Sequence, residues 1–184
     1  LIVGWIFPDN FSDSKAKNFF INKEEFKNLM IHKQKFSRLM SSLLTNESIN
    51  KIYIRPHPQI EDKKIASTIS VTEGFLTNNK VNFEENNSIY DSILKVDFAL
   101  MYYSTTLGQS ALLEIPSFCC FAHEHNENIR KKLEIDDEWI PKKNLISSQE
   151  ELEDIIDKIK NDNKYIKSII KENINLYEKY LGYA

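Results

Sequence analysis

The sequence has only two cysteines, the neighbours Cys119 and Cys120. Neighbouring cysteines cannot build a disulfide framework, so a disulfide-stapled secreted domain is excluded and a reducing compartment is expected. No apolar run approaches the ~20 residues that a membrane-spanning helix needs, and the first residues do not follow the pattern of a signal peptide. Because the chain begins at Leu1 within a predicted strand, without Met, we expect a fragment of a longer protein.

An excess of either charge sign is also missing. The chain has 24 Lys and Arg residues against 27 Asp and Glu residues, a formal net charge of -3. Proteins that wrap nucleic acid carry a clear basic excess, so nucleic acid is not expected as a partner. Internal repeats, low-complexity tracts and flexible linkers are absent too. With 41% hydrophobic and 28% charged residues, residues 1–184 are expected to fold as one domain with a real core.

Short apolar runs alternate with amphipathic segments. The runs predict strands over residues 1–7, 51–55, 81–83, 97–103 and 117–122. Helices are predicted over residues 22–44, 88–94 and 105–114, and in two segments that follow Ser148. Continuous apolar strands that alternate with helices are typical of a parallel sheet covered on both faces. The predicted fold class is therefore α/β, a Rossmann-like doubly wound parallel sheet with helices on both faces.

The loop after the second predicted strand reads Arg55-Pro56-His57-Pro58. Ligands of such sheets bind beyond the carboxyl ends of the strands, where this loop is expected. The two prolines restrict the backbone around His57, and the planar guanidinium of Arg55 suits a phosphate or a carboxylate. A rigid exposed turn with a functionless histidine is the alternative, and this loop alone does not decide between the two.

A second loop leaves the strand at residues 97–103 through three consecutive hydroxyl residues, Ser104, Thr105 and Thr106. Free backbone N–H groups at the start of a helix attract anions, and hydroxyl side chains add further donors. A plain helix cap explains the same residues. Because both loops are expected at the same sheet edge, together they favour a phosphate site.

Three segments, by their order and spacing, resemble the C-terminal half of GT-B glycosyltransferases that build bacterial surface and capsular polysaccharides. They are residues 53–58 (YIRPHP), residues 88–97 (SIYDSILKVD) and residues 103–116, from YSTT through LLEIP. Those enzymes carry an HP motif and a downstream S-S/T motif. They include GT-B sialyltransferases, capsule transferases and CDP-glycerol glycerophosphotransferases. The resemblance covers roughly residues 50–122.

The resemblance implies the donor-binding half of a two-domain transferase. Its donor is a sugar or polyol on a CMP, CDP or UDP carrier, and its product a surface polysaccharide or lipooligosaccharide. Matched residue by residue, His57 contacts the donor phosphate and is the catalytic candidate. The other implied phosphate-binding residues are Arg55, Ser104, Thr105 and Thr106.

Glu84, Glu85 and Gln109 are implied near the ribose or base. Relatives often carry Glu at the position of Gln109, and a glutamine accepts a hydrogen bond there without bringing a charge. This departure favours an alternative function, a nucleotide- or phosphate-binding module without catalysis. A sugar-nucleotide epimerase of the same architecture is the other alternative.

The resemblance also implies the partners and the location. No Asp-x-Asp sequence is present, so no metal is demanded, and no cofactor other than the nucleotide-sugar substrate is expected. The partners implied are a glycan or lipid-linked acceptor and an N-terminal GT-B domain that supplies the acceptor's base. Without that domain the chain is expected to bind donor but not to turn over. The implied location is the cytoplasm, with the full-length protein at the inner face of the membrane.

Overall fold

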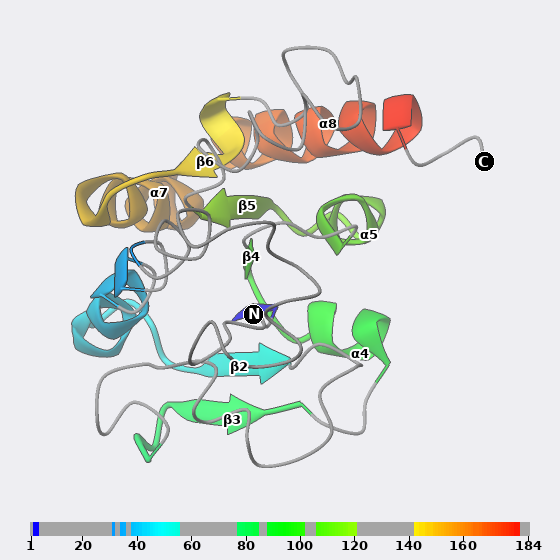
Figure 1. Ribbon diagram of the computed structural model, residues 1–184. Helices are drawn as coiled ribbons and strands as arrows, with labels where there is room; N and C mark the ends of the chain where they lie inside the picture. Colours follow the sequence, from blue (N-terminus) through cyan, green and yellow to red (C-terminus); the bar gives the residue numbers. More distant parts are fainter. Residues whose placement is uncertain are drawn as a thin grey trace, which may run out of the picture.

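The computed structural model describes residues 2–3, 31, 34–35, 38–55, 77–84, 88–101, 106–120 and 142–180. Within this part of the chain, six strands form one sheet in the order β3-β2-β1-β4-β5-β6 (Figure 1). They are β1 (Ile2–Val3), β2 (Ile52–Arg55), β3 (Val81–Phe83), β4 (Ala99–Met101), β5 (Ser117–Cys120) and β6 (Leu145–Ile146). Every neighbouring pair is parallel. The predicted α/β class and parallel sheet are confirmed, and the strand order is compatible with a Rossmann-like fold.

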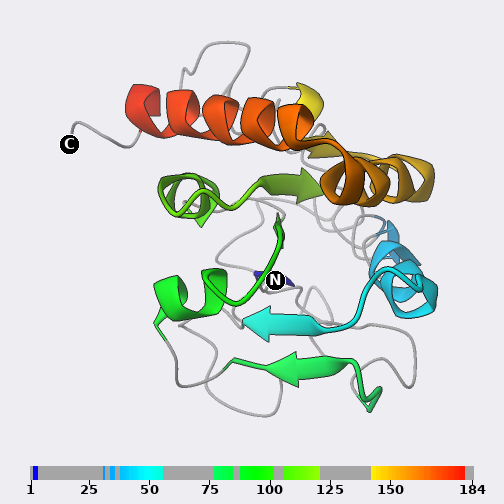
Figure 2. The same cartoon turned by 180° about the vertical axis from the view of Figure 1, so that it is seen from behind.

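Helices lie against both faces of this sheet (Figures 1 and 2). The helical segment at residues 38–45 and α7 (Gln149–Asn161) cover one face, and α4 (Ile89–Ile93) and α5 (Thr106–Leu112) cover the other. The long α8 (Asn163–Tyr180) contributes to both, and a short 3-10 helix, η1 (Lys142–Asn144), precedes β6. Among the helices in the described ranges, none is long and apolar enough to cross a membrane.

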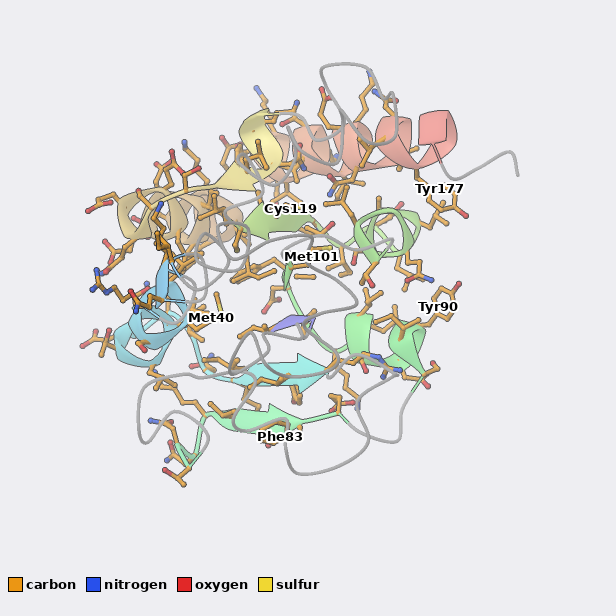
Figure 3. All side chains as sticks on the ribbon, viewed as in Figure 1. Met40, Phe83, Tyr90, Met101, Cys119 and Tyr177 are labelled. Atoms are coloured by element: carbon orange, nitrogen blue, oxygen red, sulfur yellow. The ribbon has the colours of Figure 1, made fainter. Side chains whose placement is uncertain are left out.

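Neighbouring residues of each strand point to opposite faces, which produces two apolar clusters. Ile54 and Cys120 belong to the first, together with Met40; Met101 and Cys119 belong to the second (Figure 3). The continuous apolar strands are therefore explained by burial on both sides. Burial raises the pKa of the Cys119 thiol to about 12, and that of Cys120 in the same direction. Both thiols are thus packed core groups, not reactive nucleophiles.

Two of the predicted helix starts are confirmed by their caps. The Ser88 hydroxyl accepts a hydrogen bond from the Asp91 N–H at 3.1 Å, and the Asp91 carboxylate accepts one from the Ser88 N–H at 3.3 Å. This reciprocal capping box opens α4. At α7, the Ser148 hydroxyl accepts from the Glu151 N–H at 3.2 Å. The predicted helix start at residue 22 and the cap proposed at Ser104 lie outside the described residues.

The structure differs from the sequence prediction after β5. Residues 142–146, for which the sequence predicts neither a strand nor a helix, form η1 and the two-residue strand β6. A strand of two residues has no period to detect, and its ladder depends on pairing Leu145 and Ile146 with the distant Cys119 and Cys120. The predicted strand at residues 97–103 is described as strand only over its centre, Ala99–Met101.

Glu114, two residues after the end of α5, adopts the left-handed conformation, with a φ of 58°. Its N–H donates to the Ala111 carbonyl at 2.9 Å, and the Ile115 N–H donates to the Ser110 carbonyl at 2.9 Å, the two bonds of a Schellman motif. A side chain at such a position costs roughly 1–2 kcal/mol, which glycine avoids. We expect Glu114→Gly to raise the free energy of unfolding by about 1 kcal/mol in urea denaturation. Glu114→Ala keeps a Cβ and is the control; equal stabilisation by both variants would contradict this explanation.

Candidate functional site

The strand order reverses between β1 and β4, which are neighbours at the centre of the sheet. In open parallel sheets, ligands bind in the crevice that such a reversal leaves at the carboxyl ends of the strands. Arg55, the last residue of β2, pairs in register with Val3, the last residue of β1. Met101 ends β4 on the other side of β1. The two loops singled out in the sequence therefore follow strands that flank the central strand β1.

The predicted site residues divide into two groups. Arg55, Glu84, Thr106 and Gln109 are within the described part of the chain. The others lie outside it, and their roles stay predictions: His57, Glu85, Ser104 and Thr105.

A polar cluster joins the ends of β2 and β3 to α4. Arg55 Nη1 donates to Ser92 Oγ at 3.1 Å, and Ser92 Oγ lies 3.4 Å from Glu84 Oε2. Lys95 Nζ lies 3.2 Å and 2.9 Å from Glu84 Oε1 and Oε2. Arg55, Glu84, Ser92 and Lys95 are named here the Arg55 cluster. It links three separate elements of the fold at the edge where a ligand is expected.

The Arg55 cluster lies on the α4 side of the sheet. Ile54 belongs to the core of the opposite face, so the next residue, Arg55, points toward α4. The Glu84 N–H donates to the Ile54 carbonyl at 2.9 Å, which aligns Glu84 beside Arg55. Glu84 is only 7% exposed and Ser92 is fully buried. A carboxylate so buried requires partners, and Lys95 and Ser92 supply them.

This environment bears on the ribose role predicted for Glu84. Both of its oxygens are bonded to Lys95, so a ribose hydroxyl would have to compete with an ion pair. The pair is partly open to water, because the Lys95 side chain is 40% exposed. The ribose role of Glu84 stays a prediction, whereas its contacts within the Arg55 cluster are described directly.

The first turn of α5 carries the other two described site residues. Thr106 begins the helix and is buried, and Gln109, three residues later, is half-buried. Leu107 between them belongs to the core of this face. The start of α5 is therefore anchored by apolar packing. The ribose role of Gln109 stays a prediction.

A second buried polar cluster lies at the amino ends of β5 and β6. Asn173 Nδ2 on α8 donates to Ser117 Oγ at 2.9 Å and to the Ser117 carbonyl at 3.1 Å. Asn144 Nδ2 donates to the same carbonyl at 3.3 Å and to Asn173 Oδ1. Ser117 Oγ donates in turn to the Leu107 carbonyl at 3.2 Å. Because these groups bond one another away from the ligand edge, we interpret the cluster as structural.

A cavity of ≈ 740 Å³ also lies at the amino edge of the sheet. Its lining includes Lys51, Phe98 and Pro116, which immediately precede β2, β4 and β5. Much of the remaining lining belongs to the first apolar cluster, for example Ile52 and Ile156. The cavity is thus at the edge opposite the one where ligands of parallel α/β sheets bind, and it is not part of the candidate site.

Sequence reasoning missed Ser92 and Lys95. A signal for Ser92 exists, because it lies beside Ile89 and Ile93 on the apolar face of α4 that packs in the second cluster. A hydroxyl at a position that faces the sheet indicates a polar partner there. Lys95 has no such signal, since an exposed lysine after a helix is ordinary.

In the described part of the chain, no three His, Cys, Asp or Glu side chains gather where they could hold a metal ion. Compared with protein-family models, curated proteins and solved structures, the chain has no match. The candidate site is therefore defined by the carboxyl edge of the sheet and by the Arg55 cluster.

Proposed function

We propose that this chain is the donor-nucleotide-binding half of a GT-B glycosyltransferase. The donor is a CMP-, CDP- or UDP-linked sugar or polyol, and the acceptor a bacterial surface glycan. One observation carries the proposal: the strand order reverses between β1 and β4, and both loops expected to bind phosphate follow strands adjacent to β1. That is where doubly wound folds bind nucleotides.

The chemistry follows from the charges that the transfer creates. When the glycosyl bond breaks, negative charge develops on the departing phosphate. Hydrogen-bond donors that already point at the phosphate oxygens stabilise this charge best. In this proposal the hydroxyls of Ser104 and Thr105 donate to phosphate oxygens, and His57 and Arg55 add charged hydrogen bonds. A protonated His57 also provides the proton that neutralises the leaving group.

A nucleotide-binding module without catalysis is the second candidate. Gln109 favours it, because the neutral amide cannot provide the charged ribose contact of the related transferases. Glycosyl transfer by a protein that joins this chain to an upstream GT-B domain would support the first candidate. Epimerised or hydrolysed donor without transfer would support the epimerase alternative instead.

We expect the 184-residue chain to bind a pyrimidine nucleotide at least about tenfold more tightly than the matching nucleoside, because only the nucleotide presents an anion. His57→Ala and Thr105→Ala are each expected to weaken nucleotide binding about tenfold, which is the scale of one charge-assisted hydrogen bond. Both variants should leave the affinity for the nucleoside unchanged. Calorimetric titration with CMP, CDP, UDP, GDP, cytidine and uridine measures both.

Thr45→Ala is the matched control for Thr105→Ala. Thr45 is exposed and ends the helical segment before β2, at the amino edge of the sheet. Its replacement should leave every affinity unchanged. Equal losses of nucleotide and nucleoside affinity in Thr105→Ala would show that Thr105 does not contact the phosphate. Tight binding of nucleosides alone would contradict the proposed function.

A further inference from the structure

We infer that Ser92 and Glu84 are positioning residues, which hold the Arg55 guanidinium at the carboxyl edge to bind a phosphate of the nucleotide. This inference rests on the proposed function and adds the residues that prepare its anion contact. Ser92 and Glu84 themselves need not touch the ligand. They act through Arg55, whose position at the end of β2 places it next to the central strand β1.

The geometry assigns Ser92 the central place in the Arg55 cluster. Its hydroxyl accepts from Arg55 Nη1 at 3.1 Å and has two acceptors within reach of its own proton, Glu84 Oε2 at 3.4 Å and the Ser88 carbonyl at 3.2 Å. Ser92 is fully buried. Its orientation is also set by α4, whose capping box at Ser88 fixes where the helix begins. The hydroxyl is thus a fixed anchor for a long, flexible side chain.

The buried Glu84 carboxylate is compensated within the Arg55 cluster. Its side chains carry two positive charges, on Arg55 and Lys95, against one negative charge on Glu84. Lys95 lies 2.9 Å from Glu84 and so compensates the buried carboxylate. Glu84 therefore orients Ser92, and through it Arg55, while its own charge is paired with Lys95. A guanidinium held in place in this way loses less conformational freedom when phosphate binds.

A purely structural role predicts a different behaviour. If the Arg55 cluster only stabilised the fold, removing the Ser92 hydroxyl would lower the melting temperature and affect all ligands alike. A positioning role affects only ligands with a phosphate, and only while Arg55 is present. The two roles are therefore separated by testing Ser92 with and without the guanidinium.

The experiment is a double-mutant cycle with Ser92→Ala and Arg55→Gln, titrated calorimetrically with CDP, cytidine and inorganic pyrophosphate. Ser92→Ala alone is expected to weaken the binding of CDP and of pyrophosphate about fivefold, the scale of one lost hydrogen bond. The affinity for cytidine should stay unchanged. In the Arg55→Gln background, Ser92→Ala is expected to change CDP affinity less than about twofold. Ser168→Ala removes another helical serine hydroxyl, bonded only to its own helix, and is the control. Ser92→Cys keeps a γ atom at this position but replaces the hydroxyl by a weakly hydrogen-bonding thiol, and it is used instead of Ser92→Ala if the latter does not fold.

Three results overturn the inference, and they are distinguishable. An equal loss in both backgrounds shows that Ser92 does not act through Arg55. Unchanged CDP affinity in Ser92→Ala, with the wild type binding CDP normally, rejects the positioning role but leaves the proposed function standing. No binding of any nucleotide or of pyrophosphate by the wild type rejects both.

Discussion

Replacing Gly108 by alanine is expected to lower the free energy of unfolding by about 2–3 kcal/mol. At this glycine α5 packs directly on α8, and an added Cβ would overlap Cδ2 of Tyr177 and lie 2.8 Å from its Cβ. The Cβ of Tyr177 is bonded to the backbone of α8, so rotation of the ring does not relieve the contact and the helices must separate. The better helix propensity of alanine, roughly 1 kcal/mol, offsets only part of this cost. Urea denaturation measures the change.

The Tyr177→Ala background tests the cause of that loss. Without the ring, two of the three closest contacts disappear, so Gly108→Ala should cost less than half as much as in the wild type. Gln109→Ala, on the half-buried neighbour, is the control for a new alanine in α5 and should change stability little. The same loss in both backgrounds would show that Tyr177 is not what excludes a side chain at this position.

Asn173→Ala is expected to lower the free energy of unfolding by about 3 kcal/mol. Asn173 is fully buried, and its amide bonds to both polar atoms of Ser117 and to Asn144. Removing it leaves an empty space, takes the acceptor from one N–H of Asn144 and takes the donor from the Ser117 hydroxyl. A buried polar group left unsatisfied costs roughly 1–3 kcal/mol. Urea or thermal denaturation of the variant measures the effect.

The same helix offers a matched asparagine. Asn175 lies two residues further along α8 and is exposed, so Asn175→Ala should change stability by no more than about 0.5 kcal/mol. A small effect at Asn173, or an equally large one at Asn175, would mean that the buried polar cluster does not hold α8 to β5. The comparison removes the contribution of helix propensity, because both substitutions are the same.

Much of the fold could be predicted because local residues decide it. The prolines after Arg55 mark the end of β2, and the pair Ser88 and Asp91 marks the start of α4. The apolar run at residues 117–122 predicts β5 and correctly places Cys119 and Cys120 on opposite faces. β6 could not be predicted, because its two residues become a strand only by pairing with β5.

The candidate site could be predicted only as an edge of the sheet. Local sequence points to Arg55 and to the hydroxyl residues before α5, because prolines and caps are local signals. The partners of Arg55 come from elsewhere in the sequence: Ser92 lies 37 residues later, on α4, and contacts Arg55 only in the folded structure. The ribose role of Glu84 is implied by the resemblance and stays a prediction, whereas its ion pair with Lys95 has no sequence signal. Gly108 was not singled out, since the Tyr177 that excludes a side chain there lies on the last helix.

The position of α8 has a consequence for how the domain unfolds. Ile169, in its first half, is buried in the apolar cluster of one face, and Leu176, in its second half, is buried in the cluster of the other. Among the described elements other than α8, the sheet lies between the two clusters. Detaching α8 therefore exposes apolar surface on both sides at once. We therefore expect the two faces to unfold together as one cooperative unit.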